Sequence, residues 1–104
     1  MLDFIKKILG IGPPTDYRQL LKEGGKIVDV RTTQEFSAGH IKGSINIPLH
    51  QLSSGIPRLD RKKAVILCCA SGRRSGAARK ILFAKGYERV YNGGNWLRLR
   101  DQIR

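Results

Sequence analysis

Five consecutive apolar residues, AVILC at positions 64–68, constrain the fold of this chain more than any other stretch. Successive side chains of a β-strand point to opposite faces of the sheet, so an uninterrupted apolar run indicates a strand that is buried on both faces. Strands of this kind belong to parallel sheets covered by helices. The stretch therefore predicts a parallel sheet with helices packed against it.

The rest of the chain alternates between helical and extended patterns, which is typical of an α/β protein. Further strands are expected at 26–30, 44–49 and 88–92. Helices are expected after Asp16, over 32–39, over 75–86 and at the basic C-terminal end, with a short helix and loops in 49–63. In the 75–86 helix, the predicted inner face consists of Ala77, Ala78, Ile81, Leu82 and Phe83, and Gly86 is the expected C-cap. A length of 104 residues fits one domain.

Residues 1–14, MLDFIKKILGIGPP, are predicted to form an amphipathic helix and a linker ahead of a domain at 15–104. Leu2, Ile5 and Ile8 recur at helical spacing, and the tandem prolines stop the helix. The helix either packs on its own domain or docks to a membrane or partner. Charged residues interrupt the run and no small-residue cleavage site follows, so a signal peptide is not expected. No transmembrane segment is expected either, because no apolar stretch approaches about 20 residues.

The only two cysteines, Cys68 and Cys69, are adjacent. Neighbouring residues close almost no loop and are poorly spaced for a disulfide, and two thiols are too few for a structural zinc site. Each is therefore a buried thiol or a reactive one. Free thiols favour a reducing, cytoplasmic setting.

The segment ASGRRS, residues 70–75, connects the apolar strand to the next helix. The first turn of a helix offers unpaired N–H groups and a positive dipole end, and Arg73 and Arg74 add full charges. Thiols in such surroundings have pKa values of about 3.5–7.5, and the thiolate is the nucleophile. Cys68 continues the buried strand, whereas Cys69 is the first residue that can face the loop. We therefore expect Cys69 to react with an anionic substrate; the alternative is a structural turn with two inert thiols.

Three stretches together resemble the single-domain rhodanese family of sulfurtransferases. They are DVRTTQEFSAGHIKGSINIPL (29–49), CASGRRS (69–75), and KGYERVYNGG (85–94) with Trp96 beyond it. The resemblance covers residues 16–96 or so. It implies a rhodanese-like α/β fold with a five-stranded, mainly parallel sheet and helices on both faces.

The resemblance also implies a persulfide cycle on Cys69. Its thiolate takes the outer sulfur of thiosulfate or another small anionic sulfane donor, and the persulfide passes that sulfur to cyanide, a thiol or a protein acceptor. No metal or organic cofactor is implied.

Roles for individual residues follow from the same resemblance. The amides of the loop are expected to form a cradle around the persulfide, and they belong to Ala70, Ser71, Gly72, Arg73 and Arg74. Arg74 is expected to hold the anion or the shape of the loop, and Ser75 to cap the next helix. Asp29 and Arg31 lie at the carboxyl end of a strand, and we favour scaffolding over substrate contact for both. His40 is expected to hydrogen-bond within the fold, and His50 to lie on the surface.

Two features depart from the family pattern. Glu35 stands where many two-domain thiosulfate enzymes carry a substrate-contacting arginine, and only one residue separates Gly94 from Trp96. The first departure weakens the case for thiosulfate as the physiological donor, and the second predicts a different pocket wall.

Two other functions are compatible with these residues. Counted from Cys68, the loop is Cys-x5-Arg, the spacing of cysteine phosphatases and arsenate reductases. Alternatively, the domain is a non-catalytic docking module. The formal charge of +12 suits an acidic protein or nucleic acid, although a basic helix is more often simply solvated, so nucleic acid is not favoured.

Overall fold

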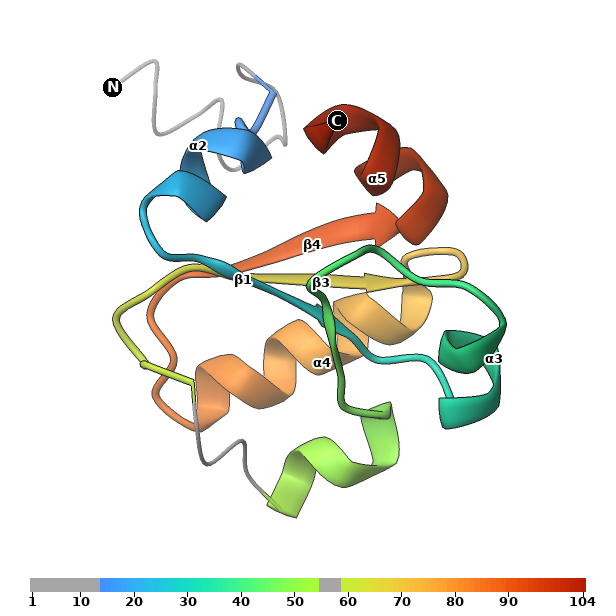
Figure 1. Ribbon diagram of the computed structural model, residues 1–104. Helices are drawn as coiled ribbons and strands as arrows, with labels where there is room; N and C mark the ends of the chain where they lie inside the picture. Colours follow the sequence, from blue (N-terminus) through green and yellow to red (C-terminus); the bar gives the residue numbers. More distant parts are fainter. Residues whose placement is uncertain (1–13, 55–58) are drawn as a thin grey trace.

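The computed structural model describes residues 14–54 and 59–104 (Figure 1). The predicted helix within residues 1–14 falls almost wholly outside this part of the chain. Four strands form one sheet in the order β2-β1-β3-β4, and every neighbouring pair is parallel. They are β1 (Lys26–Asp29), β2 (Ile45–Asn46), β3 (Val65–Cys69) and β4 (Val90–Asn95). The predicted parallel α/β fold is confirmed, with four strands in the described residues where five were expected.

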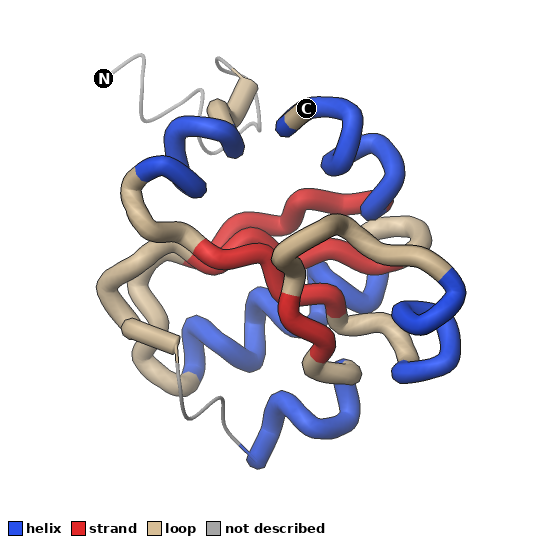
Figure 2. The backbone as a smooth tube through the Cα atoms, in the orientation of Figure 1, coloured by secondary structure: helices blue, strands red, loops and turns tan. Residues whose placement is uncertain are grey.

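Helices cover both faces of the sheet (Figures 1 and 2). They are α2 (Tyr17–Lys22), α3 (Thr33–Ala38), the 3-10 helix η1 (Leu49–Ser54), α4 (Arg73–Ala84) and α5 (Trp96–Ile103). α4 and η1 pack against one face, and α2 and α5 pack against the other. Asp16 caps α2 by accepting from the Gln19 N–H, as expected. Thr32 and Glu35 form a capping box that starts α3.

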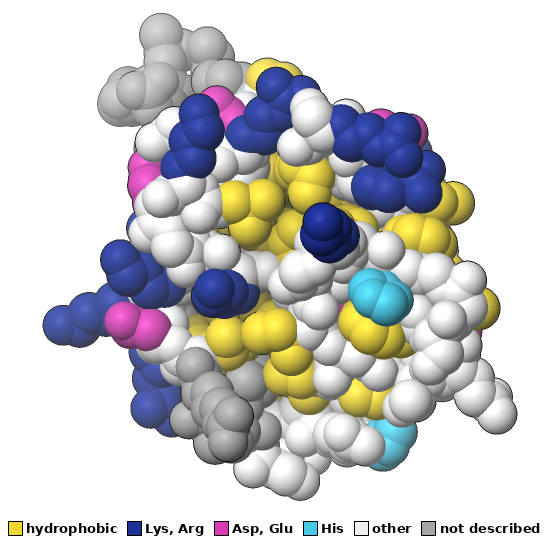
Figure 3. Space-filling view, in the orientation of Figure 1, with side chains coloured by type: hydrophobic (Ala, Val, Ile, Leu, Met, Phe, Trp, Pro, Cys, Tyr) yellow, Lys and Arg dark blue, Asp and Glu magenta, His cyan; other side chains and the backbone are white. Residues whose placement is uncertain are grey.

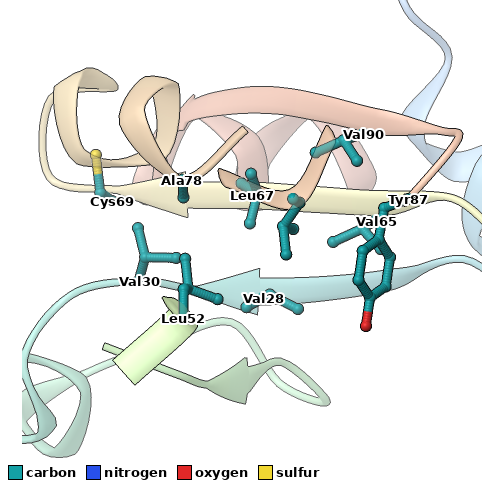
Figure 4. Packing of buried hydrophobic residues seen from close by; sticks show 10 residues of the cluster. Val28, Val30, Leu52, Val65, Leu67, Cys69, Ala78, Tyr87 and Val90 are labelled. Atoms are coloured by element: carbon teal, nitrogen blue, oxygen red, sulfur yellow. The ribbon is translucent and has the colours of Figure 1, made fainter. Parts of the chain in front are cut away.

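Two hydrophobic clusters lie on the two faces, because β3 contributes side chains to both. All five residues of β3 are buried, which confirms the strand predicted from the apolar run. The cluster beneath α4 contains Val28, Val30, Leu52, Val65, Leu67, Cys69, Ala78, Leu82, Tyr87 and Val90 (Figure 4). The cluster beneath α2 and α5 contains Leu20, Ile27, Ile41, Ala64, Ile66, Cys68 and Leu99.

The pairing of β3 with β4 contains an irregularity that shapes the site. Leu67 pairs with Asn92 but Cys69 pairs with Asn95, so β4 carries one extra residue over this interval. A Cβ at Gly93 would lie 2.9 Å from the Leu67 carbonyl oxygen, which only glycine avoids. Residues 93–95 lie beyond the strand predicted at 88–92, and the structure shows that they continue β4. The extra residue brings both asparagines to the carboxyl end of β3.

The prediction for α4 was wrong in three respects. The helix begins at Arg73 rather than near Ser75. Ala77 and Phe83 are exposed, whereas Ala78 and Leu82 are buried and Ile81 is partly buried. Residues 77 and 83 are about 100° around the helix from the buried stripe, one on each side, so they point away from the sheet. The C-cap is Lys85 rather than the expected Gly86, which lies just beyond the helix at φ +90°.

Candidate active site

A short loop joins the end of β3 to the first turn of α4. Gly72 is the N-cap of α4 and has φ +95°, a conformation that side chains rarely adopt. No side chain caps the helix. A Cβ at Gly72 would also lie 3.4 Å from the Cα of Gly94 in β4. The turn is therefore tight, and it leaves the N–H groups of the first turn of α4 directed at the end of β3.

The sulfur of Cys69 accepts hydrogen bonds from this first turn. The N–H of Gly72 lies 2.9 Å from Sγ and the N–H of Ser75 lies 3.4 Å from it, and the Ser75 hydroxyl oxygen is also 3.4 Å away. The side chain is fully buried. Burial alone would raise the pKa of Cys69, but hydrogen bonds from Ser75, Ser71 and Gly72 outweigh it and lower the pKa. The site therefore stabilises a thiolate at Cys69.

Cys68 lies on the opposite face of the sheet. Its side chain packs with Leu20, Ile66 and Leu99 beneath α2 and α5. Burial, together with the nearby charge of Asp29, raises the pKa of Cys68 to about 12. The predicted burial of this thiol is confirmed. A phosphatase-type Cys-x5-Arg site would need Cys68 inside the loop, so this geometry gives that function no support.

Arg74 does not point freely into the site, because it is paired with Glu35. Its two terminal nitrogens lie 2.6 and 2.9 Å from the Glu35 carboxylate oxygens, in a partly exposed bidentate pair. The hydrogen bond from Arg74, with one from Thr32, lowers the pKa of Glu35 to about 2. The capping box that starts α3 orients the same carboxylate. Arg74 therefore ties α4 to α3.

Asp29 and Arg31 form a buried ion pair at the carboxyl end of β1. The Arg31 guanidinium donates to both Asp29 oxygens, at 2.7 to 3.1 Å, and to the Gly39 carbonyl at 2.7 Å. The guanidinium also stacks 4.5 Å from the centre of the Trp96 ring. With these partners, Arg31 is only 4% exposed. The pair and Trp96 form the flank of the site on the α5 side.

Asn92 and Asn95, which the sequence analysis did not single out, brace the loop from β4. Asn92 donates to the Gly72 carbonyl at 3.1 Å, and Asn95 donates to the Ala70 carbonyl at 2.6 Å. Asn92 also accepts a hydrogen bond of 2.6 Å from the Ser75 hydroxyl. The signal that could have identified these two asparagines in the sequence is the presence of polar residues inside a strand that runs beside the reactive loop.

Ser75 was expected to cap α4, and this expectation was wrong. Because the helix begins two residues earlier, Ser75 is the third helical residue and its side chain is fully buried between Cys69 and Asn92. Among the other loop amides, that of Arg73 faces the Ser71 hydroxyl at 3.4 Å. The expected contacts of the amides of residues 70–74 with a persulfide stay predictions.

The two histidines lie outside the loop, His40 shortly after α3 and His50 in η1. Nδ1 of His40 is 2.8 Å from the Phe36 carbonyl oxygen, and the two rings stack with centroids 3.7 Å apart. The predicted internal hydrogen bond of His40 is thus confirmed. His50 is exposed, also as expected.

A basic hollow of about 830 Å³ opens beside the loop on the outer side of α4. Arg73, Arg79 and Lys80 line it together with Phe83, and Gly72 and Asn92 form the edge shared with the loop. Lys and Arg side chains also cover much of the face seen in Figure 3, most densely over α2 and α5. Positive charge near the loop raises the local concentration of anions.

Comparison with known proteins shows which family has this arrangement of strand, loop and helix. The model of the rhodanese-like domain family matches residues 13–95, most of the chain. The chain belongs to the rhodanese-like family. The resemblance seen in the sequence is confirmed, and the match includes the loop and both bracing asparagines.

Curated relatives of this rhodanese-like protein include enzymes named thiosulfate sulfurtransferase. GlpE of Pseudomonas aeruginosa is 33% identical over 79 residues, which are 76% of this chain and 72% of the relative. PspE of Escherichia coli is 38% identical over 69 residues, which are 64% of this chain and 66% of the relative. These names agree with the identification of the chain as an enzyme of the rhodanese type.

Solved structures show the same fold. The human single-domain sulfurtransferase TSTD1 is similar with a TM-score of 0.69 and 29% identity, over 84% of this chain and 97% of that one. A rhodanese with anions from E. coli is similar with a TM-score of 0.63 and 34% identity, over 70% and 88% of the two chains. In the described part of the rhodanese-like protein, no helix is both long and apolar enough to cross a membrane.

Proposed function

We propose that this protein is a sulfurtransferase that carries sulfane sulfur as a persulfide on Cys69. The observation that carries the proposal is the pair of N–H groups, from Gly72 and Ser75, that meet the Cys69 sulfur at the start of α4. The names of the relatives support the reaction class.

The first half-reaction loads sulfur from thiosulfate or a persulfide donor. The Cys69 thiolate attacks the outer sulfur of the donor, and a new S–S bond forms as the S–S bond of the donor breaks. The bonding electrons leave with sulfite or with the donor thiolate. A thiolate is required for this attack, and the hydrogen bonds around Cys69 favour that form.

The second half-reaction transfers the sulfur to an acceptor. Cyanide or a thiolate attacks the outer sulfur of the persulfide, and Cys69 leaves as a thiolate. A persulfide is an anion, so we expect the amides of residues 70–74 to turn toward its outer sulfur. The same N–H groups stabilise Cys69 as a leaving group.

We propose that the surrounding ion pairs maintain the shape of the site and do not contact the substrate. Asp29 and Arg31 satisfy each other in a buried pair, which supports scaffolding for both. Arg74 holds the loop through Glu35, so the anionic donor meets the amides and the exposed Arg73 instead. With Arg74 engaged, a persulfide donor fits the site as well as thiosulfate does.

The natural setting of the protein is part of this proposal. Two free thiols suit a reducing cytoplasm. The basic hollow beside the loop suits an anionic donor or an acidic acceptor protein, and we do not favour nucleic acid as a partner.

Intact-protein mass spectrometry after brief treatment with thiosulfate tests the proposal. The wild type and Cys68→Ala should each gain one sulfur atom that dithiothreitol removes, and Cys69→Ser should gain none. In the cyanide assay, Cys69→Ser should lose on the order of a thousandfold or more in rate. Sulfur gain by Cys69→Ser, or no gain by any variant with either thiosulfate or a small persulfide, would contradict the proposal.

A further inference from the structure

The orientation of the Asn92 side-chain amide is fixed by two backbone groups. Its nitrogen faces the Gly72 carbonyl oxygen at 3.1 Å, and its oxygen faces the Gly94 N–H at 3.0 Å. A flipped amide would place a donor against the Gly94 N–H and an oxygen against the Gly72 carbonyl, and both contacts would be repulsive. The Asn92 oxygen is therefore the atom that meets the Ser75 hydroxyl, 2.6 Å away.

This orientation determines where the hydroxyl hydrogen of Ser75 points. An amide oxygen only accepts, so Ser75 must donate its single hydrogen to Asn92. The Cys69 sulfur lies 3.4 Å from the same hydroxyl oxygen, which then offers the sulfur only lone pairs. A protonated Cys69 can donate its S–H to that oxygen, but a thiolate receives no hydrogen bond from the Ser75 hydroxyl unless the hydroxyl turns away from Asn92.

We propose that Asn92 is a positioning residue that competes with the Cys69 thiolate for the hydroxyl hydrogen of Ser75. The inference rests on the proposed role of Cys69 as the reactive thiol. Asn92 thereby makes Cys69 less acidic than the loop amides alone would make it. The nucleophilicity of a thiolate falls as the acidity of its thiol rises, so a less acidic Cys69 is a better nucleophile when it takes up sulfur. The same change makes Cys69 a poorer leaving group when the sulfur is transferred.

Changing Asn92 or Ser75 leaves the charged and titratable groups around Cys69 in place. Arg74 on α4 and Cys68 on β3 interact electrostatically with Cys69. Asp29 on β1 and Glu35 on α3 act on Arg74. From β4, the two side chains that reach the loop are the uncharged Asn92 and Asn95. If Asn92 is changed and the pKa of Cys69 shifts only when Ser75 is present, the shift therefore reports on the hydroxyl hydrogen of Ser75.

A double-mutant cycle tests this competition through the pKa of Cys69, measured as the pH dependence of its alkylation by iodoacetamide. The cycle compares Asn92→Ala, Ser75→Ala and the double variant with the parent, all carrying Cys68→Ala. With Ser75 present, Asn92→Ala should lower the pKa of Cys69 by about one unit, a tenfold change in the thiolate equilibrium. In the Ser75→Ala background, the same substitution should not lower it. Asn92→Asp keeps an acceptor for Ser75 and adds negative charge, so it should raise the pKa.

The opposite sign overturns the proposal. If Asn92 only holds the loop through the Gly72 carbonyl, Asn92→Ala should loosen the amides around the sulfur and raise the pKa of Cys69 with or without Ser75. An unchanged pKa would also overturn it. Alkylation does not depend on sulfur transfer, so a protein that shows the predicted shift but loads no sulfur would contradict the proposed function alone.

Discussion

Cys68 and Cys69 are neighbours in one buried strand, yet their surroundings shift their pKa values in opposite directions. Cys68 packs among aliphatic side chains beneath α2 and α5, near the Asp29 carboxylate, and its pKa rises to about 12. Cys69 faces the start of α4, where full burial would raise its pKa but hydrogen bonds from Ser75, Ser71 and Gly72 outweigh burial and lower it.

The difference teaches that burial does not by itself decide the reactivity of a thiol. One step along a strand turns a side chain to the other face of the sheet. On the α5 side, Cys68 meets a hydrocarbon core braced by the Asp29–Arg31 pair. On the α4 side, the strand ends against unpaired backbone donors. The buried ion pair on the first face should therefore matter mainly for stability, and the loop on the second face should matter mainly for reactivity.

The largest effect should come from breaking the ion pair on the Cys68 side. Arg31→Ala leaves the Asp29 carboxylate buried without its partner, so we expect the free energy of unfolding to fall by about 3–5 kcal/mol. Arg89→Ala is the matched control, because its pair with Glu23 is exposed to solvent at 3.4 Å and should contribute little to stability. Urea denaturation measures both; equal losses would show that the buried Asp29–Arg31 pair matters no more for stability than an exposed pair.

An intermediate effect should come from the loop on the Cys69 side. Gly72→Ala forces a side chain into φ +95° and should reduce stability by about 1–2 kcal/mol. It should also displace the Gly72 N–H from the sulfur and slow alkylation of Cys69 at neutral pH by about tenfold. Gly43→Ala, at φ +85° with open space around it, should show the stability loss alone. If Cys69 is alkylated at the same rate in both variants, the Gly72 N–H does not activate Cys69.

The smallest effect should appear in the pH dependence of stability. The raised pKa of Cys68 contributes stability that is fully present below the unfolded pKa of about 8.5 and is lost as pH rises toward about 12. The lowered pKa of Cys69 contributes stability that is present above about 8.5 and is lost as pH falls through its folded value.

Unfolding measured from about pH 7 to 9 separates these opposite contributions. Relative to Cys68→Ala, the wild type should lose stability above about pH 8.5, by up to about 1.4 kcal/mol per pH unit. Relative to Cys69→Ala, it should gain stability as pH rises toward about 8.5. The same sign for both comparisons would show that the two thiols share one environment.

Much of the fold was predictable because local patterns carried it. The apolar run at 64–68 specified a strand buried on both faces, and Asp16 and the two threonines at 32 and 33 marked two helix starts, with Thr32 as the actual cap of the second. The start of α4 was less predictable, because no side chain caps it and Gly72 takes its place in a left-handed conformation. Phe83 was misplaced because an apolar residue beside the buried stripe of a helix resembles one within it.

The site was predictable only where its residues are consecutive. Cys69 and the loop stand together in the sequence, so the chemistry could be inferred from them. Asn92 and Glu35 reach the site through strand pairing and through an ion pair across 39 positions. The register irregularity that brings Asn92 beside Gly72 depends on tertiary packing at Gly93, which no local pattern reveals.

Site-resolved alkylation of the folded wild-type protein tests the central claim most directly. After a limited pulse of iodoacetamide at neutral pH, tandem mass spectrometry locates the added group on Cys68 or Cys69. The account predicts modification of Cys69, with Cys68 reacting only after unfolding in urea. Modification of Cys68 in the folded protein at a rate similar to that of Cys69 would contradict it, because the two faces of β3 would then not separate the two thiols.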